Sequence, residues 1–335
     1  MKALVYTGVE ELTYQDRPMP VPAEGEQLVR ILASGICGSD MHAFLGHDER
    51  RPAPLTLGHE AAGVVVGGPD DGRRVTINPL VSCLTCRDCK AGKNNLCANR
   101  QIISMPPREG AFAEYVTVPE RNLVTVPDDV DLKAAALAEP IACGWHAARL
   151  ARAVLGGSFD GQRCAVIGGG AIGVGAALSL RAQGATNITV IEPNALRRET
   201  LSHIGGFDVA APESAGMPAA GSVDCVIEGV GYAATRETAS ALARQGGVIA
   251  HIGLGEARGG LDIRRMTLQE ITFIGTYTYT PQDFAETAQA IFDGRLGALN
   301  WMETRPLAAG QSAFVDIRSG LVAAPKVVLI PEHKD

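Results

Sequence analysis

A glycine-rich turn between two apolar runs constrains the fold of this chain most strongly. Residues 163–167 resemble a buried strand, the turn Gly-Gly-Gly-Ala-Ile-Gly follows at 168–173, and a second apolar run at 188–191 ends at Glu192. Glycines at the first, third and sixth positions let the backbone approach a pyrophosphate, and the helix that follows offers free N–H groups at its N-terminus. With an acid at the end of the second run, this unit predicts a dinucleotide-binding βαβ fold.

Strand-like and helical runs alternate through the rest of this part of the chain. The strand-like runs lie at residues 223–227, 247–252 and 271–274, and residues 233–244 form a helical pattern between two of them. Such alternation is typical of a doubly wound parallel sheet with helices on both faces. Ligands bind these sheets at the carboxyl edge, where the ends of the strand-like runs would lie.

The acid after the second strand bears on which dinucleotide binds. Glu192 would accept hydrogen bonds from the adenosine ribose and would repel a 2′-phosphate, so NAD is favoured over NADP. Arg197 and Arg198 follow closely, and a nearby arginine can accommodate that phosphate, so NADP stays the less favoured alternative. The residues expected to contact the cofactor are Gly168, Gly170, Ile172, Gly173, Glu192, Arg197, Val230, Ile252, Gly253 and Leu254.

The chain before about Thr125 has a different composition and a different pattern of apolar residues. It is rich in Val, Gly and Pro, and short apolar runs stand at residues 27–32, 62–66, 73–77 and 113–118. Short runs bounded by turn residues indicate strands, so we expect a compact β-rich domain here.

The stretch from Cys37 to Glu60 carries a candidate catalytic site. Cysteine, histidine and glutamate, present as Cys37, His59 and Glu60, are the side chains that a catalytic zinc takes, with a fourth position left for water or substrate. Ser39 and His42 lie close to Cys37 in sequence, as a hydroxyl and an imidazole that pass a proton would need to. Asp40 between them is expected to orient its neighbours.

Four further cysteines crowd into residues 83–97, as Cys83, Cys86, Cys89 and Cys97. Four thiolates at this spacing can close a tetrahedral zinc site with no open position, which indicates a structural metal. The alternative is four unrelated buried cysteines. The surrounding arginine and lysine side chains make the stretch too polar for a core, so the structural zinc is favoured.

A helical stretch separates the β-rich part from the part in which strands and helices alternate. Residues 132–138 form a helical pattern, Pro140 is expected to end or bend it, and a second helix is expected over residues 143–154. Glu139, a carboxylate in an apolar context, is either a surface residue at a helix end or a group aimed at the metal.

The C-terminal tail contains both a helical and a strand-like pattern. A helical pattern at residues 283–292 and a strand-like run at 326–330 are expected to rejoin the β-rich domain. The predicted division is therefore a catalytic domain of residues 1–142 and 280–335, and a cofactor domain of residues 143–279.

Length and charge agree with this division. A chain of 335 residues exceeds the size at which one core keeps growing, so two domains are expected. The net charge of −7 gives no reason to expect nucleic acid or an anionic membrane as a partner. No run approaches 18 apolar residues, and the eight cysteines fit reduced thiols and metal better than disulfides, so we expect a cytoplasmic protein.

Together these residues resemble the zinc-dependent alcohol dehydrogenases of the medium-chain dehydrogenase/reductase superfamily. The resemblance covers essentially the whole chain, and it implies an α/β protein with a GroES-like catalytic domain beside a Rossmann domain. The Cys-Gly-Ser-Asp-x-His run at 37–42 and the pair Glu139-Pro140 are closer to the polyol branch, such as sorbitol, galactitol-phosphate and L-threonine dehydrogenases. In that branch Cys37 and His59 would be zinc ligands, Glu60 a third ligand or one alternating with water, and Glu139 a group at or behind the metal.

The resemblance also implies the reaction. A secondary alcohol, from a polyol or sugar, would be oxidised to a ketone with hydride transfer to NAD, and Ser39 would pass the hydroxyl proton through the cofactor ribose to His42. Two zinc ions per chain and a homo-oligomer, dimer or tetramer, would accompany it. The loop of residues 44–54 is a departure from the pattern of this resemblance, which leaves the substrate open.

Two alternatives stay open. An L-threonine-type or phosphorylated-polyol dehydrogenase would use the same frame, and a phosphate would need Arg50 and Arg51 at the cleft. A non-catalytic NAD-binding protein would keep the fold and lose the metal.

Overall fold

The computed structural model describes residues 1–333 and divides into two compact units. The first unit contains Met1–Glu139, Thr280–Asp293 and the chain from Met302 onward. The second unit contains Pro140–Tyr279 and Gly294–Trp301. Over the described residues, no helix combines the length and the apolar character needed to span a bilayer.

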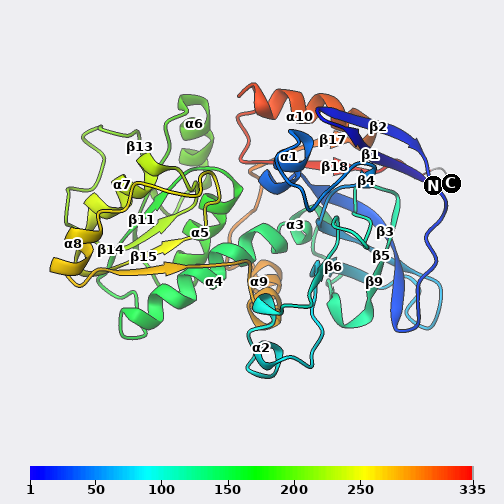
Figure 1. The fold of residues 1–335 in the computed structure, drawn as a ribbon, viewed down its shortest axis with the longest axis horizontal. Coiled ribbons are helices and arrows are strands. Elements are labelled where there is room, and N and C mark those ends of the chain that lie inside the picture. The colour runs from blue at the N-terminus through cyan, green and yellow to red at the C-terminus, as the bar shows by residue number, and fades with distance from the viewer. Residues whose placement is uncertain (334–335) are drawn as a thin grey trace. The chain divides into compact units, whose positions relative to one another are not determined.

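The second unit is built on a six-stranded sheet in the order β13-β12-β11-β14-β15-β16 (Figure 1). The strands, all parallel, are β11 (Arg163–Ile167), β12 (Asn187–Ile191), β13 (Asp208–Ala210), β14 (Val223–Glu228), β15 (Ala243–His251) and β16 (Thr272–Gly275). The order reverses between β11 and β14, which marks the edge where ligands bind such sheets. The predicted doubly wound parallel sheet is confirmed.

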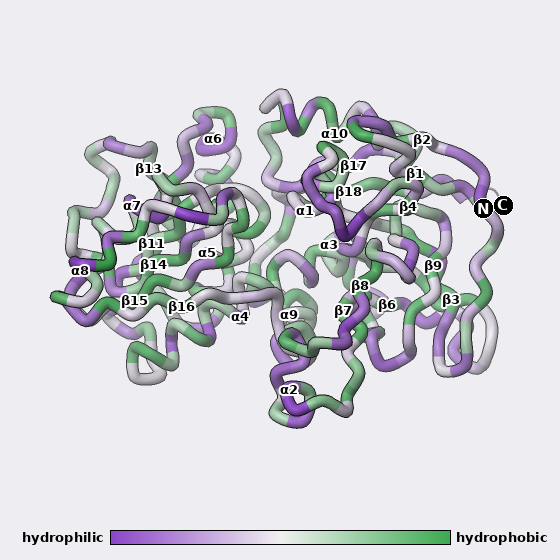
Figure 2. The backbone as a smooth tube through the Cα atoms, viewed as in Figure 1, coloured by the Kyte–Doolittle hydropathy of each residue, from purple (hydrophilic) through white to green (hydrophobic). Residues whose placement is uncertain are grey.

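Helices cover this sheet. They are α4 (Ala138–Val154), whose first two residues belong to the first unit, α5 (Ala171–Ala182), α6 (Ala195–Ile204), α7 (Ala233–Leu242) and α8 (Ile263–Leu268). Helix α5 packs on β11 and β12, and α7 packs on β14 and β15. The strands between them carry apolar residues such as Val166, Val190 and Ile249, which are fully buried. Figure 2 shows hydrophobic segments along the strands of this sheet.

The first unit is β-rich, as predicted. Its largest sheet has seven strands, in the order β10-β6-β5-β3-β18-β17 with β9 paired to β3, and smaller sheets have the orders β2-β1-β4 and β7-β8. The strands are β1 (Lys2–Gly8), β2 (Glu11–Asp16), β3 (Glu26–Gly35), β4 (Leu55–Thr56), β5 (Glu60–Val66), β6 (Arg74–Ile77), β7 (Leu80–Val81), β8 (Gln101–Ile102), β9 (Tyr115–Pro119), β10 (Leu123–Thr125), β17 (Met302–Pro306) and β18 (Lys326–Ile330). The helices are α1 (Gly38–Phe44), α2 (Arg87–Lys90), α3 (Leu132–Ala136), α9 (Pro281–Phe292) and α10 (Gly310–Arg318), with 3₁₀ turns η1 (Asn94–Leu96), η2 (Glu120–Asn122) and η3 (Leu307–Ala309).

The C-terminal strand lies beside the strand that leads into Cys37. Strand β18 pairs antiparallel with β3, so that Val328 stands opposite Gly35. This pairing explains why the tail rejoins the first unit, and it brings the start of β18 close to the candidate catalytic site. The core beneath the larger sheet contains Val29, Ile31, Val75 and Ile77 from neighbouring strands.

The prediction for the helices around Pro140 was wrong. Helix α3 ends at Ala136, and α4 begins at Ala138 rather than at residue 143. Pro140 is the third residue of α4, where a helical N–H has no acceptor within the helix, so its missing donor costs nothing. Glu139 therefore lies in the first turn of a helix, and at 6% exposure it is buried, which excludes the surface alternative.

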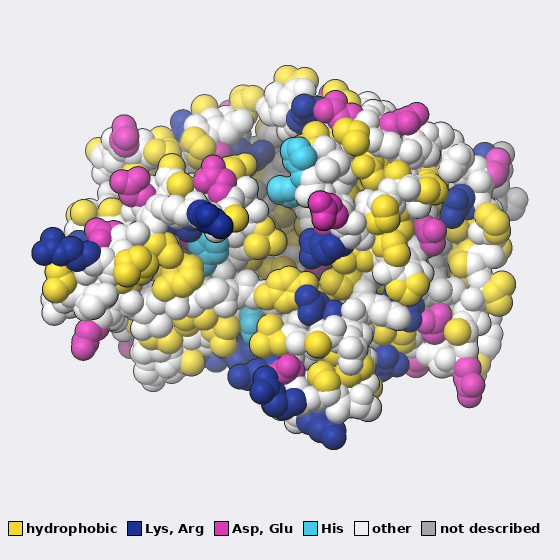
Figure 3. Space-filling view, viewed as in Figure 1, with side chains coloured by type: hydrophobic (Ala, Val, Ile, Leu, Met, Phe, Trp, Pro, Cys, Tyr) yellow, Lys and Arg dark blue, Asp and Glu magenta, His cyan; other side chains and the backbone are white. Residues whose placement is uncertain are grey.

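Charged side chains of both signs are scattered over the face that Figure 3 shows, without a large area of one sign. This distribution agrees with the modest net charge of −7.

Candidate zinc and cofactor sites

Strand pairing brings together the three residues of the candidate catalytic metal site. The ligand atoms of Cys37, His59 and Glu60 all lie within 4.8 Å of one another. Cys37 follows the end of β3, and Glu60 opens β5 directly opposite Gly35. A Cβ atom at position 35 would lie 2.1 Å from Glu60 Oε2, so only glycine there leaves room for the carboxylate.

Buried partners fix the imidazole of His59. Its Nδ1 lies 3.4 Å from Asp40 Oδ1 and 3.3 Å from Ser104 Oγ, whereas its Nε2 lies 3.5 Å from Ser39 Oγ. Asp40 is fully buried and also accepts the N–H groups of Cys37 (3.0 Å) and Gly58 (3.2 Å). A partner on Nδ1 fixes the ring and leaves Nε2 for a metal, which is the arrangement that zinc-binding histidines need.

The electrostatics of this pair follow from its burial. Burial would raise the pKa of Asp40, but attraction to His59 and the charge of Arg51 outweigh it and lower the pKa below its ordinary value. Burial would lower the pKa of His59, yet the charges of Asp40 and Cys37 raise it well above the ordinary value.

A buried lysine pairs with Glu60. Lys326 Nζ lies 2.7 Å from Glu60 Oε1, 2.6 Å from Oε2 and 2.8 Å from the carbonyl oxygen of Ile36. Burial would lower the pKa of Lys326, but the charges of Glu60, Cys37 and Glu139 raise it. The charge of Glu139 therefore acts on Lys326, although its carboxylate does not belong to the cluster of Cys37, His59 and Glu60.

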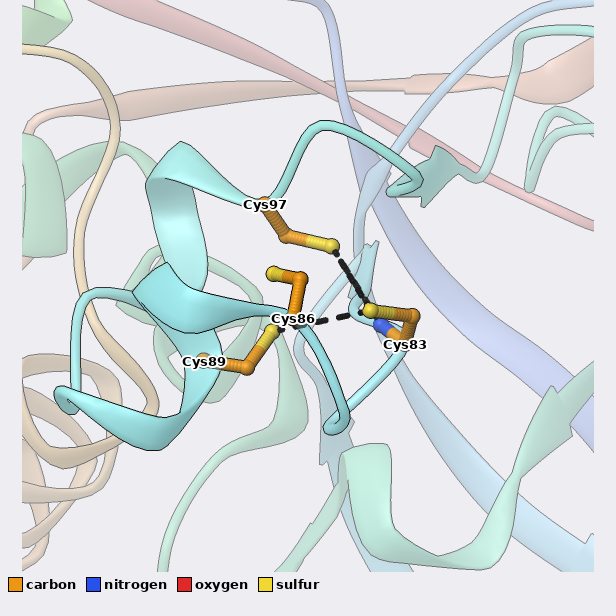
Figure 4. Close-up of side chains that lie close together, drawn as sticks. All are labelled: Cys83, Cys86, Cys89 and Cys97. Atoms are coloured by element: carbon orange, nitrogen blue, oxygen red, sulfur yellow. Dashed lines mark hydrogen bonds between the residues drawn. The ribbon is translucent and has the colours of Figure 1, made fainter.

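The four cysteines of the lobe converge as their spacing predicts (Figure 4). Cys83 Sγ lies 3.4 Å from Cys97 Sγ and 4.0 Å from Cys89 Sγ. Sulfur atoms bound tetrahedrally to one zinc at ~2.3 Å stand about 3.8 Å apart, so the lobe fits this metal. The backbone N–H of Thr85 holds the pKa of Cys83 down at about 5, while burial raises the pKa of Cys89 to about 12.

The glycine-rich turn has the geometry that a pyrophosphate needs. Gly168 has a φ of 100°, and a Cβ at Gly173 would lie 1.8 Å from the carbonyl oxygen of Gly168. A Cβ at Gly170 would meet no atom within 4 Å, so this position faces open space at the start of α5.

The carboxylate of Glu192 is hydrogen-bonded to the backbone of this turn. It accepts the N–H groups of Gly169 and Asn194, each at 2.8 Å, and the side chain is buried. Arg197 Nη1 lies 3.8 Å from Glu192 Oε2, and Arg198 donates to the carbonyl oxygen of Glu192 at 2.9 Å. Both arginines are therefore engaged at the end of β12.

The loops after β14 and β15 interlock at the carboxyl edge. A Cβ at Gly253 would lie 2.1 Å from the backbone nitrogen of Gly231. Glu228 accepts the N–H groups of Val230 and Gly231 on its carboxylate, and its Oε2 lies 2.9 Å from His251 Nε2. An open pocket of about 700 Å³ follows the second loop, lined in part by His251, Ile252, Gly253, Leu254, Phe273 and Thr276.

Comparison with known proteins decides the family. Residues 23–128 match the alcohol dehydrogenase GroES-like domain, and residues 171–293 match the zinc-binding dehydrogenase domain. The chain is 32% identical over 311 residues to L-galactonate-5-dehydrogenase of Escherichia coli (strain K12), covering 89% of each protein. It belongs to the zinc-binding alcohol dehydrogenases of the medium-chain dehydrogenase/reductase superfamily.

Other members support this assignment. This dehydrogenase is 32% identical over 313 residues to sorbitol dehydrogenase of Bacillus subtilis (strain 168), covering 88% of the chain and 87% of that protein. Acetophenone reductase from Geotrichum candidum NBRC 4597, solved in complex with NAD, superposes with a TM-score of 0.86 at 26% identity and covers 98% of this chain and 96% of its own. The predicted superfamily, two-part fold and NAD(P)-dependent dehydrogenase class are confirmed. The family is one that binds zinc, and the two clusters could hold it.

The structure separates the two proton-relay candidates of the dehydrogenase by exposure. Ser39 lies at the ligand cluster and is half-buried, and His42 lies one turn further along α1 and is exposed. Among the described residues the structure shows no hydrogen bond between these two side chains, so their relay role stays a prediction.

Three residues of the sites were missed in the sequence. Lys326 and Ser104 reach the ligand cluster, and His251 reaches the cofactor edge. For Lys326 a signal existed, because a lysine that opens the apolar run Val-Val-Leu-Ile is unusual for a buried strand. No local pattern marked Ser104 or His251.

Proposed function

We propose that this dehydrogenase oxidises a secondary hydroxyl of an unphosphorylated polyol or sugar-derived alcohol to a ketone, with NAD as hydride acceptor. The observation that carries the proposal is the cluster of Cys37, His59 and Glu60, with Nδ1 of the histidine held by Asp40 and Ser104. The relatives named L-galactonate-5-dehydrogenase and sorbitol dehydrogenase support a polyhydroxylated substrate.

The residues present fit a catalytic zinc. Bound by Cys37, His59 and Glu60, such an ion supplies a Lewis acid that lowers the pKa of an alcohol hydroxyl. Asp40 holds the imidazole in place, and Lys326 holds the carboxylate of Glu60. These partners keep the ligand geometry fixed without rearrangement during the reaction.

Two residues of α1 would handle the hydroxyl proton. Ser39 Oγ stands 3.5 Å from His59 Nε2, so it lies where the substrate hydroxyl would approach and can accept its proton. His42, exposed on the same helix, is the group that would release the proton to solvent. The nicotinamide of NAD supplies the hydride acceptor.

Glu192 supports NAD over NADP. Its carboxylate is buried and held at the end of β12 by two backbone N–H groups, so it cannot swing away from a 2′-phosphate. Arg197 is drawn toward that same carboxylate, and Arg198 binds backbone carbonyls, which leaves neither guanidinium directed at a phosphate.

The cations suggested for a phosphorylated substrate have other partners. Arg50 donates to Asp48 Oδ1 at 2.8 Å, and Arg51 donates to Asp48 Oδ2 at 2.7 Å. This pairing favours an unphosphorylated alcohol over a phosphate ester.

We also propose the roles of the two domains, the cellular compartment and the oligomeric state. We assign catalysis to residues 1–142 and 280–335, cofactor binding to residues 143–279, and a supporting role behind the metal to Glu139. Four thiolates that hold zinc need a reducing compartment, which supports the cytoplasm. A homo-oligomer of two or four copies is part of the proposal, and sedimentation would determine the number.

The direct test measures NADH formation by the zinc-loaded protein. The panel contains sugar alcohols, sugar acids, simple secondary alcohols, L-threonine and a phosphorylated polyol. We expect turnover with one of the unphosphorylated polyhydroxylated compounds. Preference for the phosphorylated compound or for L-threonine would overturn the substrate class, and absence of any turnover with zinc and NAD both bound would overturn the proposed reaction.

A further inference from the structure

Arg51 is a buried cation in the loop between α1 and β4. Its side chain is 3% exposed, whereas that of the neighbouring Arg50 is 63% exposed. A buried guanidinium needs partners for its donors, because an unpaired charge in the interior is costly. Arg51 Nη1 donates to Asp48 Oδ2 at 2.7 Å, and Nε donates to the carbonyl oxygen of Ser104 at 3.0 Å.

The second of these bonds leads to a candidate zinc ligand. Ser104 is fully buried, and its Oγ lies 3.3 Å from His59 Nδ1. Ser104 has a φ of 71°, in the left-handed region that few residues other than glycine adopt. Such a conformation persists only where its surroundings hold it, and the guanidinium of Arg51 is one of the groups that do so.

The other partner of His59 is Asp40, whose Oδ1 lies 3.4 Å from the same Nδ1. The path from Arg51 to the imidazole runs through Ser104, whose carbonyl oxygen accepts from the guanidinium and whose hydroxyl lies at Nδ1.

We propose that Arg51 is a positioning residue that fixes the imidazole of His59 through Ser104, and so sets how long zinc stays bound at Cys37, His59 and Glu60. The loop between α1 and β4 is thereby tied to the candidate metal site. This inference rests on the proposed function, since it takes that cluster to hold the catalytic zinc.

The test follows zinc release from the full-length, zinc-loaded protein to a chromogenic chelator. Partners behind a metal ligand typically contribute about 10–100-fold to metal affinity, so we expect R51M to release the catalytic zinc about 10–100-fold faster than the wild type. The zinc of the four-cysteine lobe serves as an internal reference and should leave at its wild-type rate. R50M is the matched control, because Arg50 binds the same Asp48 from the surface, and it should behave as the wild type.

A second variant covers the case in which R51M fails to fold. S104A keeps the buried charge and removes only the hydroxyl at His59 Nδ1, so we expect faster release of the catalytic zinc by a smaller factor. Wild-type release by folded R51M, or by S104A where R51M does not fold, would overturn the proposal. So would equal acceleration of both zinc ions in R51M, because that indicates general unfolding. A wild type that binds zinc only in the lobe would instead contradict the proposed function.

Discussion

Lys326 balances a group of buried negative charges in the first unit. Its Nζ contacts both oxygens of Glu60, and its pKa is raised by Glu60, Cys37 and Glu139. A buried ion pair is costly to break from one side, because the remaining charge has no solvent to stabilise it. The lysine therefore belongs to the surroundings of the candidate metal site, although it is not one of the candidate ligands.

We expect K326M to destabilise the first unit strongly. Removing one partner of a buried pair costs about 3–5 kcal/mol, and urea unfolding of the variant and the wild type measures it. K133M is the control, since Lys133 pairs with Asp131 at the surface at 45% exposure, and its loss should cost about 0.5 kcal/mol or less. Equal free energies of unfolding for the two variants would show that Lys326 does not stabilise the buried carboxylate of Glu60.

Residue type and family order identified the candidate ligands Cys37, His59 and Glu60, because zinc accepts few side chains. They also identified one partner, Asp40, but neither Lys326 nor Ser104. Lys326 lies 266 residues from Glu60 and reaches it only because β18 pairs with β3. Register between distant strands is set by the packing of the whole sheet, which no local pattern reveals.

At the scale of elements, the glycine-rich turn shows how one short segment serves both folding and binding. Gly173 packs against the carbonyl of Gly168, whereas Gly170 faces open space. The turn was predictable because strand, glycines and helix follow one another locally. The start of α4 could not be predicted in the same way. A proline such as Pro140 is accepted in the first turn of a helix and is also common where a helix ends, so it does not distinguish the two positions.

The two glycines should respond differently to alanine. G173A places a Cβ 1.8 Å from a carbonyl oxygen, so we expect loss of both stability and NADH binding. G170A should unfold within about 1 kcal/mol of the wild type, since an N-cap glycine replaced by alanine costs little, yet bind NADH at least about tenfold more weakly because its Cβ would meet the pyrophosphate. Urea unfolding and NADH fluorescence titration measure the two properties. Wild-type NADH affinity in G170A would show that the pyrophosphate does not lie against this turn.

At the scale of the whole molecule, metal chemistry and the dinucleotide turn belong to different units. Cys37, His59 and the lobe cysteines lie in the first unit, and the glycine-rich turn lies in the second. This two-part architecture was predictable because the family resemblance covers nearly the whole chain. The contact of Arg51 with Ser104 joins residues 53 apart in the sequence, so it could be found only in the structure.

The separation predicts that the two activities can be removed one at a time. C37A deletes a thiolate from the candidate ligand set, so we expect alcohol oxidation to fall below detection while NADH binding, measured by fluorescence, stays near the wild-type level. C86A opens the four-cysteine lobe instead. Because a structural zinc contributes directly to folding, C86A should lower the unfolding midpoint more than it lowers turnover of the protein that remains folded.

Each variant serves as the control for the other, since both remove one thiolate from the first unit. Loss of NADH binding in C37A would mean that the cofactor turn depends on the metal site, which contradicts the separation of roles. A C86A protein as stable as the wild type but inactive would place the lobe in catalysis, against the closed set of four sulfur ligands that leaves a substrate no position on the metal.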